Sequence, residues 1–400
     1  MSKATGWVTA RTLAGCGVVA CLALPGAAPG TAATPVNAAR PTTLAAAAPA
    51  RAAAAAAQAA VPGRLYSVAA VSANDAWAVG LDPQGTLIMH WNGAQWSRYP
   101  LSRAGYFIGV AARSASDAWA VGGTNWFTGS QTLAMHWNGR SWTRVPAPTP
   151  GGGGLFTAVA ATSSRNAWAV GLAGPGPGTP SPVLPLIEHW NGRHWSVQPV
   201  AALPDGGSFS GVAALSPSNA WAVGETGLNS EGTGQRTLIE HWDGTSWTRV
   251  ASPDQPGASA GYLRQVTVIA AGNAWAVGAA TMPDGRIRTL TAFWDGRRWR
   301  QVPSPTPGGD AELLGVTASW RHNIWAVGMT SPSGCGPCRT LIMHWNGVRW
   351  KVLPSPNPPG NYYLYTLFGI AAVARDDIWA AGTTGYASTL IVHWNGSAWS

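Results

Sequence analysis

The chain has 400 residues and a formal net charge of +9, yet only 10% of its residues are charged and 46% are hydrophobic. This balance supplies enough apolar surface for a large core and argues against disorder over most of the length. Residues 1–60 hold four basic residues and no acid, so removing these four from the total of 25 leaves 21 bases against 16 acids, or +5. Because the arginines are scattered and no aromatic face for stacking bases accompanies them, we expect no binding of nucleic acid.

The N-terminal segment has the layout of a secretory signal peptide. Lys3 and Arg11 precede an apolar stretch from Leu13 to Leu24, and small residues suited to cleavage follow it. The stretch is too short to span a bilayer stably. We therefore predict a signal peptide over residues 1–33, an Ala- and Pro-rich low-complexity linker over 34–60, and one repeat domain over 61–400. This organisation predicts a secreted, extracellular monomer.

Two cysteines in the N-terminal segment offer an alternative to free secretion. Cys16 and Cys21 each end a short stretch that resembles a lipoprotein cleavage box. Cys16 has almost no apolar segment ahead of it, and Cys21 is followed by more apolar residues than such boxes usually tolerate. Free secretion is the preferred interpretation, and lipidation at Cys21, which would attach the protein to the cell surface, is the alternative.

From Leu65 onward, one pattern occurs seven times. Each copy has a small apolar run, Asp/Asn-Ala-Trp-Ala-Val-Gly, a variable insert, Thr-Leu-Ile-x-His-Trp-Asn-Gly, and a last Trp five residues after the preceding one, with minor variations. The three tryptophans of the seven copies account for 21 of the 24 in the chain. The first Trp of each copy marks the period: Trp77, Trp119, Trp168, Trp221, Trp275, Trp325 and Trp379. Such a period indicates a repeat architecture whose units share one core.

Each copy contains four short strand candidates and no useful stretch of helical periodicity. In the sixth copy these are Leu314–Ser319, Ile324–Gly328, Thr340–Trp345 and Trp350–Leu353. Four antiparallel strands with Asn-Gly or Asp-Gly turns are typical of a propeller blade. We predict an all-β fold, a seven-bladed β-propeller of four-stranded antiparallel blades. The strand rich in small residues should be innermost, and the tryptophans should pack between blades.

The first copy, Leu65–Gly80 followed by Thr86–Trp96, resembles a blade of the BNR/Asp-box class, including the photosystem-assembly-factor type of propeller. It is also similar to the kelch repeat of the galactose-oxidase central domain, where a glycine-ended strand is followed by an aromatic residue and a Trp. The resemblance covers all seven copies and implies the propeller fold. It implies no particular activity, because His and Trp stand where the Asp-box has its Ser/Thr and Asp.

Six histidines share one strand position, which Phe293 fills in the fifth copy: His90, His136, His189, His241, His344 and His393. Strand alternation places this position in mid-blade, away from the central channel, with neighbouring copies too far apart to share a metal ion. We therefore predict hydrogen-bonded structural imidazoles, no metal site and no cofactor. The Asp or Asn before the first Trp interchanges between copies and is predicted to cap its own turn.

Functional residues are sought among those that do not repeat. In a four-stranded blade, the second-to-third and blade-to-blade connections lie on one face, and these vary in length here, whereas those of the other face are short. The residues of this variable-loop face predicted to bind ligand are Trp126, Phe127, Asp284, Arg286, Tyr362 and Tyr363. Cys335 and Cys338 lie in another insert, with no helix to follow, and we predict a local disulfide in preference to redox chemistry.

These observations predict a non-catalytic binding propeller whose variable-loop face recognises a glycan or an extracellular protein. Aromatic side chains beside Asp and Arg are a usual means of holding sugars. No catalytic set stands out. The alternative is a polysaccharide-active hydrolase or lyase on the same scaffold, using non-repeating loop acids such as Asp284, Asp310 and Glu312.

The seventh copy reaches Trp399-Ser400, where the other copies run on through a fourth strand. Val61-Pro62, directly before the first copy, matches the end of that strand. We therefore predict that the N-terminal segment completes the seventh blade and closes the ring.

Overall fold

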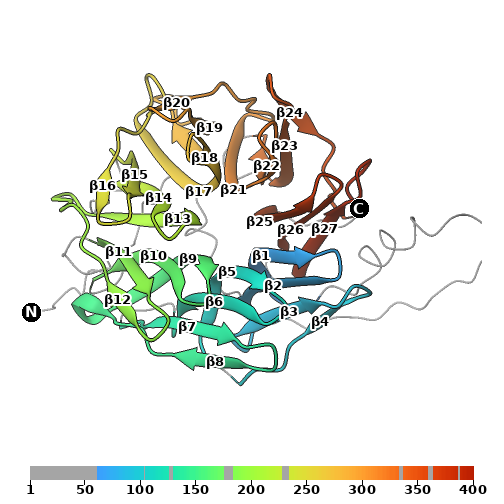
Figure 1. The fold of residues 1–400 in the computed structure, drawn as a ribbon. Helices are drawn as coiled ribbons and strands as arrows, with labels where there is room; N and C mark the ends of the chain where they lie inside the picture. Colours follow the sequence, from blue (N-terminus) through green and yellow to red (C-terminus); the bar gives the residue numbers. More distant parts are fainter. Residues whose placement is uncertain are drawn as a thin grey trace, which may run out of the picture.

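The computed structural model describes residues 61–102, 104–125, 129–174, 183–227, 234–332, 337–358, 364–385 and 388–400. Seven antiparallel sheets follow one another around a ring, which confirms the predicted seven-bladed β-propeller (Figure 1). Within each sheet the strands follow chain order, and the first strands of neighbouring blades contact one another around the axis. In the described residues the one helical element is a short 3-10 turn, Pro150–Gly152, and no helix is long and apolar enough to cross a membrane.

Strand bounds are closely similar from blade to blade. The innermost strands are β1 (Arg64–Ser72), β5 (Tyr106–Ser114), β9 (Gly154–Ser163), β13 (Gly207–Ser216), β17 (Ala260–Ala270), β21 (Asp310–Trp320) and β25 (Tyr365–Ala374). The second strands are β2 (Asp75–Leu81), β6 (Asp117–Gly123), β10 (Asn166–Ala173), β14 (Asn219–Thr226), β18 (Asn273–Thr281), β22 (Asn323–Ser331) and β26 (Asp377–Thr384). The third strands are β3 (Leu87–Trp91), β7 (Thr132–Trp137), β11 (Leu184–Trp190), β15 (Arg236–Trp242), β19 (Ile287–Trp294), β23 (Arg339–Trp345) and β27 (Ser388–Trp394). The outer strands are β4 (Trp96–Arg98), β8 (Trp142–Val145), β12 (Trp195–Val197), β16 (Trp247–Arg249), β20 (Trp299–Gln301) and β24 (Trp350–Leu353).

The first two strands of the sixth blade are longer than the sequence predicts. The apolar pattern ends with the core, but backbone pairing continues beyond it, with Asp310 opposite Ser331 and Glu312 opposite Met329. The placement of Asp310 and Glu312 in a loop was therefore wrong, because both belong to β21.

Small residues line the innermost strands because these strands crowd one another. A Cβ added at Gly109 would lie 2.9 Å from the Cα of Ala158 in the next blade, and one added at Gly315 would lie 2.8 Å from the carbonyl oxygen of Phe368. Each innermost strand also has two register shifts against its partner, as Leu65/Ser67 and Ala70/Ser72 show in β1. Bulges of this kind increase the twist of a strand, which suits strands packed around an axis.

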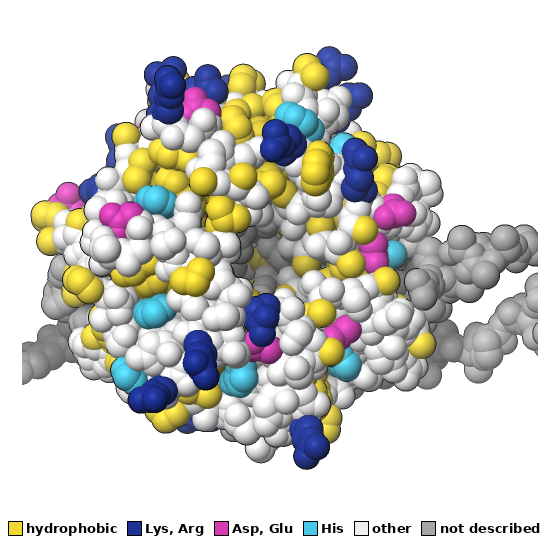
Figure 2. Space-filling view, in the orientation of Figure 1, with side chains coloured by type: hydrophobic (Ala, Val, Ile, Leu, Met, Phe, Trp, Pro, Cys, Tyr) yellow, Lys and Arg dark blue, Asp and Glu magenta, His cyan; other side chains and the backbone are white. Residues whose placement is uncertain are grey.

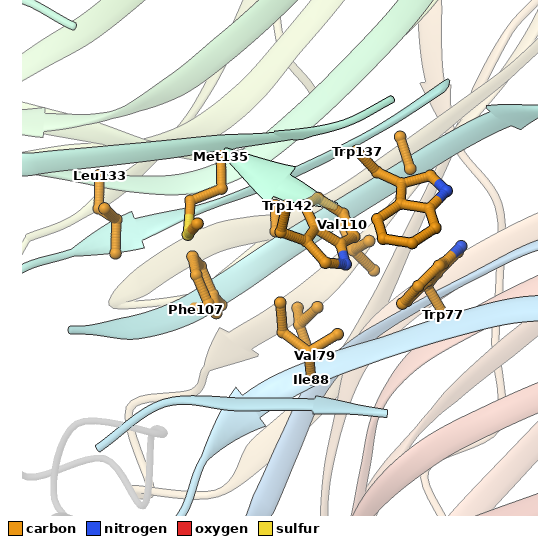
Figure 3. Close-up of a cluster of buried hydrophobic side chains, with 11 residues drawn as sticks. Trp77, Val79, Ile88, Phe107, Val110, Leu133, Met135, Trp137 and Trp142 are labelled. Carbon is orange, nitrogen blue, oxygen red and sulfur yellow. The ribbon is translucent and has the colours of Figure 1, made fainter. Parts of the chain in front are cut away.

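Three tryptophans fill each contact between neighbouring blades. Trp77 of the first blade lies against Trp137 and Trp142 of the second, with ring centroids 4.9 and 5.2 Å apart (Figure 3). The same arrangement recurs around the ring, and Trp379 of the seventh blade meets Trp91 and Trp96 of the first at 4.9 and 5.4 Å. Aromatic pairs contribute about 1 kcal/mol each beyond the burial of their area, so these clusters are the main contacts holding the blades together.

Two segments far apart in the chain complete the seventh blade. At one end of β27, Trp399 pairs with Trp394, and the amides of Ser400 and His393 donate to each other's carbonyl oxygens at 3.0 and 2.9 Å. At the other end, Pro62 pairs with Ser388, and the amide of Thr389 donates to the carbonyl oxygen of Val61 at 3.0 Å. Val61 and Pro62 thus close the ring on the seventh blade, as the repeat pattern predicted.

Two buried glutamates interrupt the apolar contacts between blades. Glu188 and Glu240 occupy the strand position that holds Met89, Met135 or Met343 in other blades. Both are fully buried, and neither carboxylate oxygen of Glu188 has a hydrogen-bond partner. Burial raises the pKa of Glu188 to about 8 and that of Glu240 to about 7, the latter opposed by Arg249 and the amide of Ala201.

We predict that these two glutamates make the propeller less stable as pH rises. Their folded pKa values lie above the unfolded value, so both are protonated in either state below about pH 4. Between that pH and about 7 to 8, each glutamate ionises only in the unfolded chain, which lowers the free energy of unfolding by roughly 1.4 kcal/mol per pH unit. Replacing both residues by Met, the residue that other blades hold there, should flatten this loss. Chemical denaturation of wild type and the E188M/E240M variant across this pH range measures it, and parallel stability profiles would contradict it.

We also predict that the hydroxyl of Thr389 supports ring closure. The amide of Val61 donates to Thr389 Oγ1 at 3.1 Å, so a Thr389→Val substitution leaves this amide without its acceptor and should cost about 1 kcal/mol. Thr389→Ser keeps the hydroxyl and serves as the control. Thermal unfolding of the two variants tests the prediction, which fails if Val and Ser at this position give equal stability.

Candidate functional site

The short turns carry a repeated group of His, Asp or Asn, and Trp. Nε2 of His90 lies 2.9 Å from Oδ1 of Asp75, and the imidazole stacks on Trp77 with ring centroids 4.1 Å apart. In the fifth blade Phe293 takes the place of the histidine, and Oδ1 of Asn273 is buried without a hydrogen-bond partner. The histidine and the preceding Asp or Asn therefore act as a pair that ties the third strand of a blade to its first short turn.

Figure 2 shows the face on which histidine side chains recur at intervals around a central hollow. Because these histidines precede the Asn-Gly or Asp-Gly turns, it is the short-turn face. In the described part of the chain, no group of three or more His, Cys, Asp or Glu side chains is placed to hold a metal ion.

On the variable-loop face, the structure describes two of the six residues predicted to bind ligand. Asp284 and Arg286 are exposed in the turn between β18 and β19, where Oδ1 of Asp284 accepts the amide of Arg286 at 3.0 Å. The guanidinium of Arg286 covers Gly309, since a Cβ added there would lie 2.5 Å from Nη1. The other four residues lie outside the described part of the chain: Trp126, Phe127, Tyr362 and Tyr363.

The predicted disulfide also falls partly outside the described residues. Cys335 belongs to the segment that is not described, whereas Cys338 is buried directly before β23. The disulfide therefore remains a prediction.

A buried ionic cluster lies close to the variable-loop face. Nε of Arg264 is 3.0 Å from Oε1 of Glu312, and Nη1 of Arg264 is 3.5 Å from Oε1 of Glu225. The three residues come from β17, β21 and β14, in the fifth, sixth and fourth blades. One side chain reaches both neighbouring blades here because the inner strands converge toward the axis, and the cluster lies toward the variable-loop ends of these strands.

One guanidinium faces two carboxylates in this cluster. Burial alone would lower the pKa of Arg264, but Glu312 and Glu225 raise it above its usual value, so the cation persists. Burial raises the pKa of Glu312, although Arg264 opposes the shift. The guanidinium carbon of Arg264 also lies 4.1 Å from the ring centroid of Tyr262, whose pKa burial raises, so this phenol stays neutral. The cluster therefore sets one guanidinium against two acidic side chains.

Glu312 is enclosed within the fold. Its side chain is only 2% exposed, and a hydrogen bond from the hydroxyl of Tyr262 favours its ionised form. Glu225, with 11% of its side chain exposed, is the acid of the cluster that lies nearer to solvent.

An aromatic pair occupies the equivalent strand position in two other blades. Tyr66 and Phe368 occupy, in the first and seventh blades, the bulged position that Arg264 occupies in the fifth. Their rings meet edge to face with centroids 5.4 Å apart. The inner strands thus carry an ionic cluster in the fourth to sixth blades and an aromatic pair in the first and seventh blades.

Arg264 is distinguished in the sequence by its charge, although it does not lie in a loop of variable length. The equivalent residues in the other six innermost strands are uncharged: Tyr66, Ile108, Thr157, Ser210, Leu314 and Phe368. A single charge in a strand otherwise made of small and apolar residues needs a buried partner. Alignment of the seven innermost strands would have shown it.

No protein-family model matches this chain, and no curated protein matches it. Among solved structures, it is similar to YCF48 bound to D1 peptide, with 16% sequence identity over 84% of this chain and 94% of that one and a TM-score of 0.52. It is also similar to a polysaccharide lyase of family PL25, an ulvan lyase (11% identity, 84% and 95% coverage, TM-score 0.54), and to the WD40 repeats of RRP9 (10%, 83% and 94%, 0.53). At these identities the likeness shows the propeller fold alone, and it assigns the chain to neither the BNR nor the kelch family.

We predict that Arg264 is needed for stability and that its loss is felt most at high pH. Arg264→Met leaves the buried carboxylates of Glu312 and Glu225 without a cation, which should cost about 3 kcal/mol or more near neutral pH. Without Arg264, burial acts unopposed by this cation and holds the pKa of Glu312 further above its unfolded value, so the loss should shrink as pH falls toward about 4, where this carboxyl is protonated in both states. Denaturation curves measure it, and the R264M/E312Q double variant should recover part of the stability. An equal loss at all pH values would contradict it.

Proposed function

We propose that this protein is a secreted, non-catalytic binding propeller that recognises a protein partner at the mouth of its channel, on the variable-loop face. The observation that carries the proposal is the cluster of Glu225, Arg264 and Glu312, in which two carboxylates share one guanidinium. A Lys or Arg side chain from a partner would pair with the carboxylate of Glu225, which is the more exposed acid of the cluster. The layout of residues 1–33 supports secretion.

The mixed character of the mouth favours a peptide over a glycan. Binding surfaces for proteins combine aromatic anchors with a few charged groups, and here the pair of Tyr66 and Phe368 complements the ionic cluster. A neutral sugar would leave the charge of the cluster unbalanced. The structure of YCF48, which has a similar fold, is bound to a peptide, which supports a peptide as the kind of ligand that we propose.

The acids on which a hydrolase or lyase would depend are held by structural partners. Asp284 caps its own turn, Oδ1 of Asp310 accepts the amide of Ile287 at 3.0 Å, and Glu312 is paired with Arg264. These contacts favour a role in positioning the loops of the fifth and sixth blades. We therefore propose binding rather than catalysis.

We predict that short Lys- or Arg-bearing peptides bind the propeller and that Glu225→Gln weakens their binding about tenfold by removing one carboxylate of the cluster. Fluorescence anisotropy with basic peptides and neutral counterparts measures this. Asp205→Asn removes an exposed acid elsewhere on the same face and should change nothing.

Failure of every basic peptide to bind, or equal binding by wild type and the Glu225 variant, would overturn the proposal. A parallel screen of chromogenic glycosides and cell-wall polymers, with Asp284→Ala as the control, tests the alternative. Activity lost in that variant would favour an enzyme.

A further inference from the structure

Trp320 does not belong to the repeat and is exposed. Three tryptophans in each of seven copies leave three of the 24 unexplained, and Trp320 is the one among these that the structure describes. It ends β21 at the short turn leading to β22, and 62% of its surface is exposed. The proposed binding site lies on the opposite face, so Trp320 has no part in it.

Trp320 replaces a residue that stabilises the same turn in other blades. Four blades have a serine there, whose hydroxyl accepts the amide two residues ahead at 3.2 to 3.3 Å: Ser72, Ser114, Ser163 and Ser216. The sixth blade gives up this hydrogen bond and exposes an indole to water. The fifth and seventh blades also lack the hydroxyl, with Ala270 and Ala374 at this position, so the exposed indole is the feature of the sixth blade that indicates a contact outside the propeller.

The neighbouring turn of the same blade is also apolar. Val348, between β23 and β24, is 81% exposed, and Val352 on β24 is 42% exposed. The two turns touch, since a Cβ added at Gly347 would lie 3.3 Å from the Cβ of His322. Trp320 and Val348 therefore stand on adjacent turns at the same end of the sixth blade, and we call this pair of exposed apolar side chains the apolar strip.

Basic side chains surround this strip. Six of them are exposed in the short turns and outer strands of the fifth and sixth blades: Arg297, Arg298, Arg300, Arg321, Arg349 and Lys351. The described residues of these turns include one acid, Asp295, which accepts the amides of Arg297 and Arg298 and lies 3.1 Å from Arg300. In Figure 2, Lys and Arg side chains stand among hydrophobic ones over the part of the ring where β19 to β24 lie in Figure 1.

We propose that the short-turn face of the fifth and sixth blades is a second docking surface, which takes an acidic protein segment with an apolar side chain seated on Trp320 and Val348. The basic rim attracts the acidic segment and the strip supplies the anchor, the arrangement in which a central apolar contact carries most of the affinity. The exposed valines favour a protein over a nucleic acid, which would need further aromatic side chains for stacking bases.

The test uses the full chain and a fluorescein-labelled peptide of Asp and Glu with a central Phe-Leu pair. Fluorescence anisotropy at low and at physiological salt should show saturable binding that weakens with salt. The Trp320→Ser variant introduces the residue that four other blades hold, so it preserves the turn, and it should weaken binding about tenfold. Leu215→Ser, which changes an exposed apolar residue beside the equivalent turn of the fourth blade, should leave binding within about twofold of wild type.

Three results would overturn the proposal. The first is no binding of the peptide by wild type, and the second is equal binding by wild type and the Trp320 variant. The third is tighter binding of a single-stranded oligonucleotide of equal charge than of the peptide, which would assign the surface to nucleic acid. A peptide whose Phe-Leu pair is replaced by Ser-Ser should bind wild type as weakly as the original peptide binds the Trp320 variant.

Discussion

The contact between tryptophans of neighbouring blades is the interaction on which the rest of the propeller depends. The first Trp of each blade packs against the second and third Trp of the next, and Trp379 returns the series to the first blade. Most of these rings meet edge to face, as Trp168 and Trp247 do with an interplanar angle of 89°. The indole N–H groups of Trp77 and Trp142 are buried in these contacts without a conventional hydrogen-bond partner.

Because aromatic contacts hold the blades together, residues at other positions can vary without separating the blades. The innermost strands can be small, and a residue such as Arg264 can replace a neutral one there without opening the ring. The turns are fixed by their own hydrogen bonds, so Trp320 can depart from the serine pattern while β21 and β22 stay paired. The two surfaces that we propose have opposite charge preferences and lie on opposite faces, which allows the propeller to hold two partners at once.

The fold could be predicted from the sequence because every blade repeats the same sequence pattern. Trp at fixed spacing, Asn-Gly turns and a Val-Gly strand end each specify a local structure, and seven copies specify a ring. The ionic cluster could not be predicted in the same way, because Glu225, Arg264 and Glu312 come from three copies and meet only after the ring forms. A role for Trp320 could not be predicted for another reason. Binding residues are expected in loops of variable length, whereas Trp320 lies at a turn whose length is constant.

The closure of the seventh blade also sets the order of events during synthesis. Val61 leaves the ribosome long before Thr389, the residue that hydrogen-bonds to it. Until the last copy emerges, Trp91 and Trp96 on the first blade have no Trp379 to cover them. The first blade of the growing chain therefore exposes an aromatic surface until translation is nearly complete. That surface must be kept from other chains during synthesis, although it is buried in the finished ring.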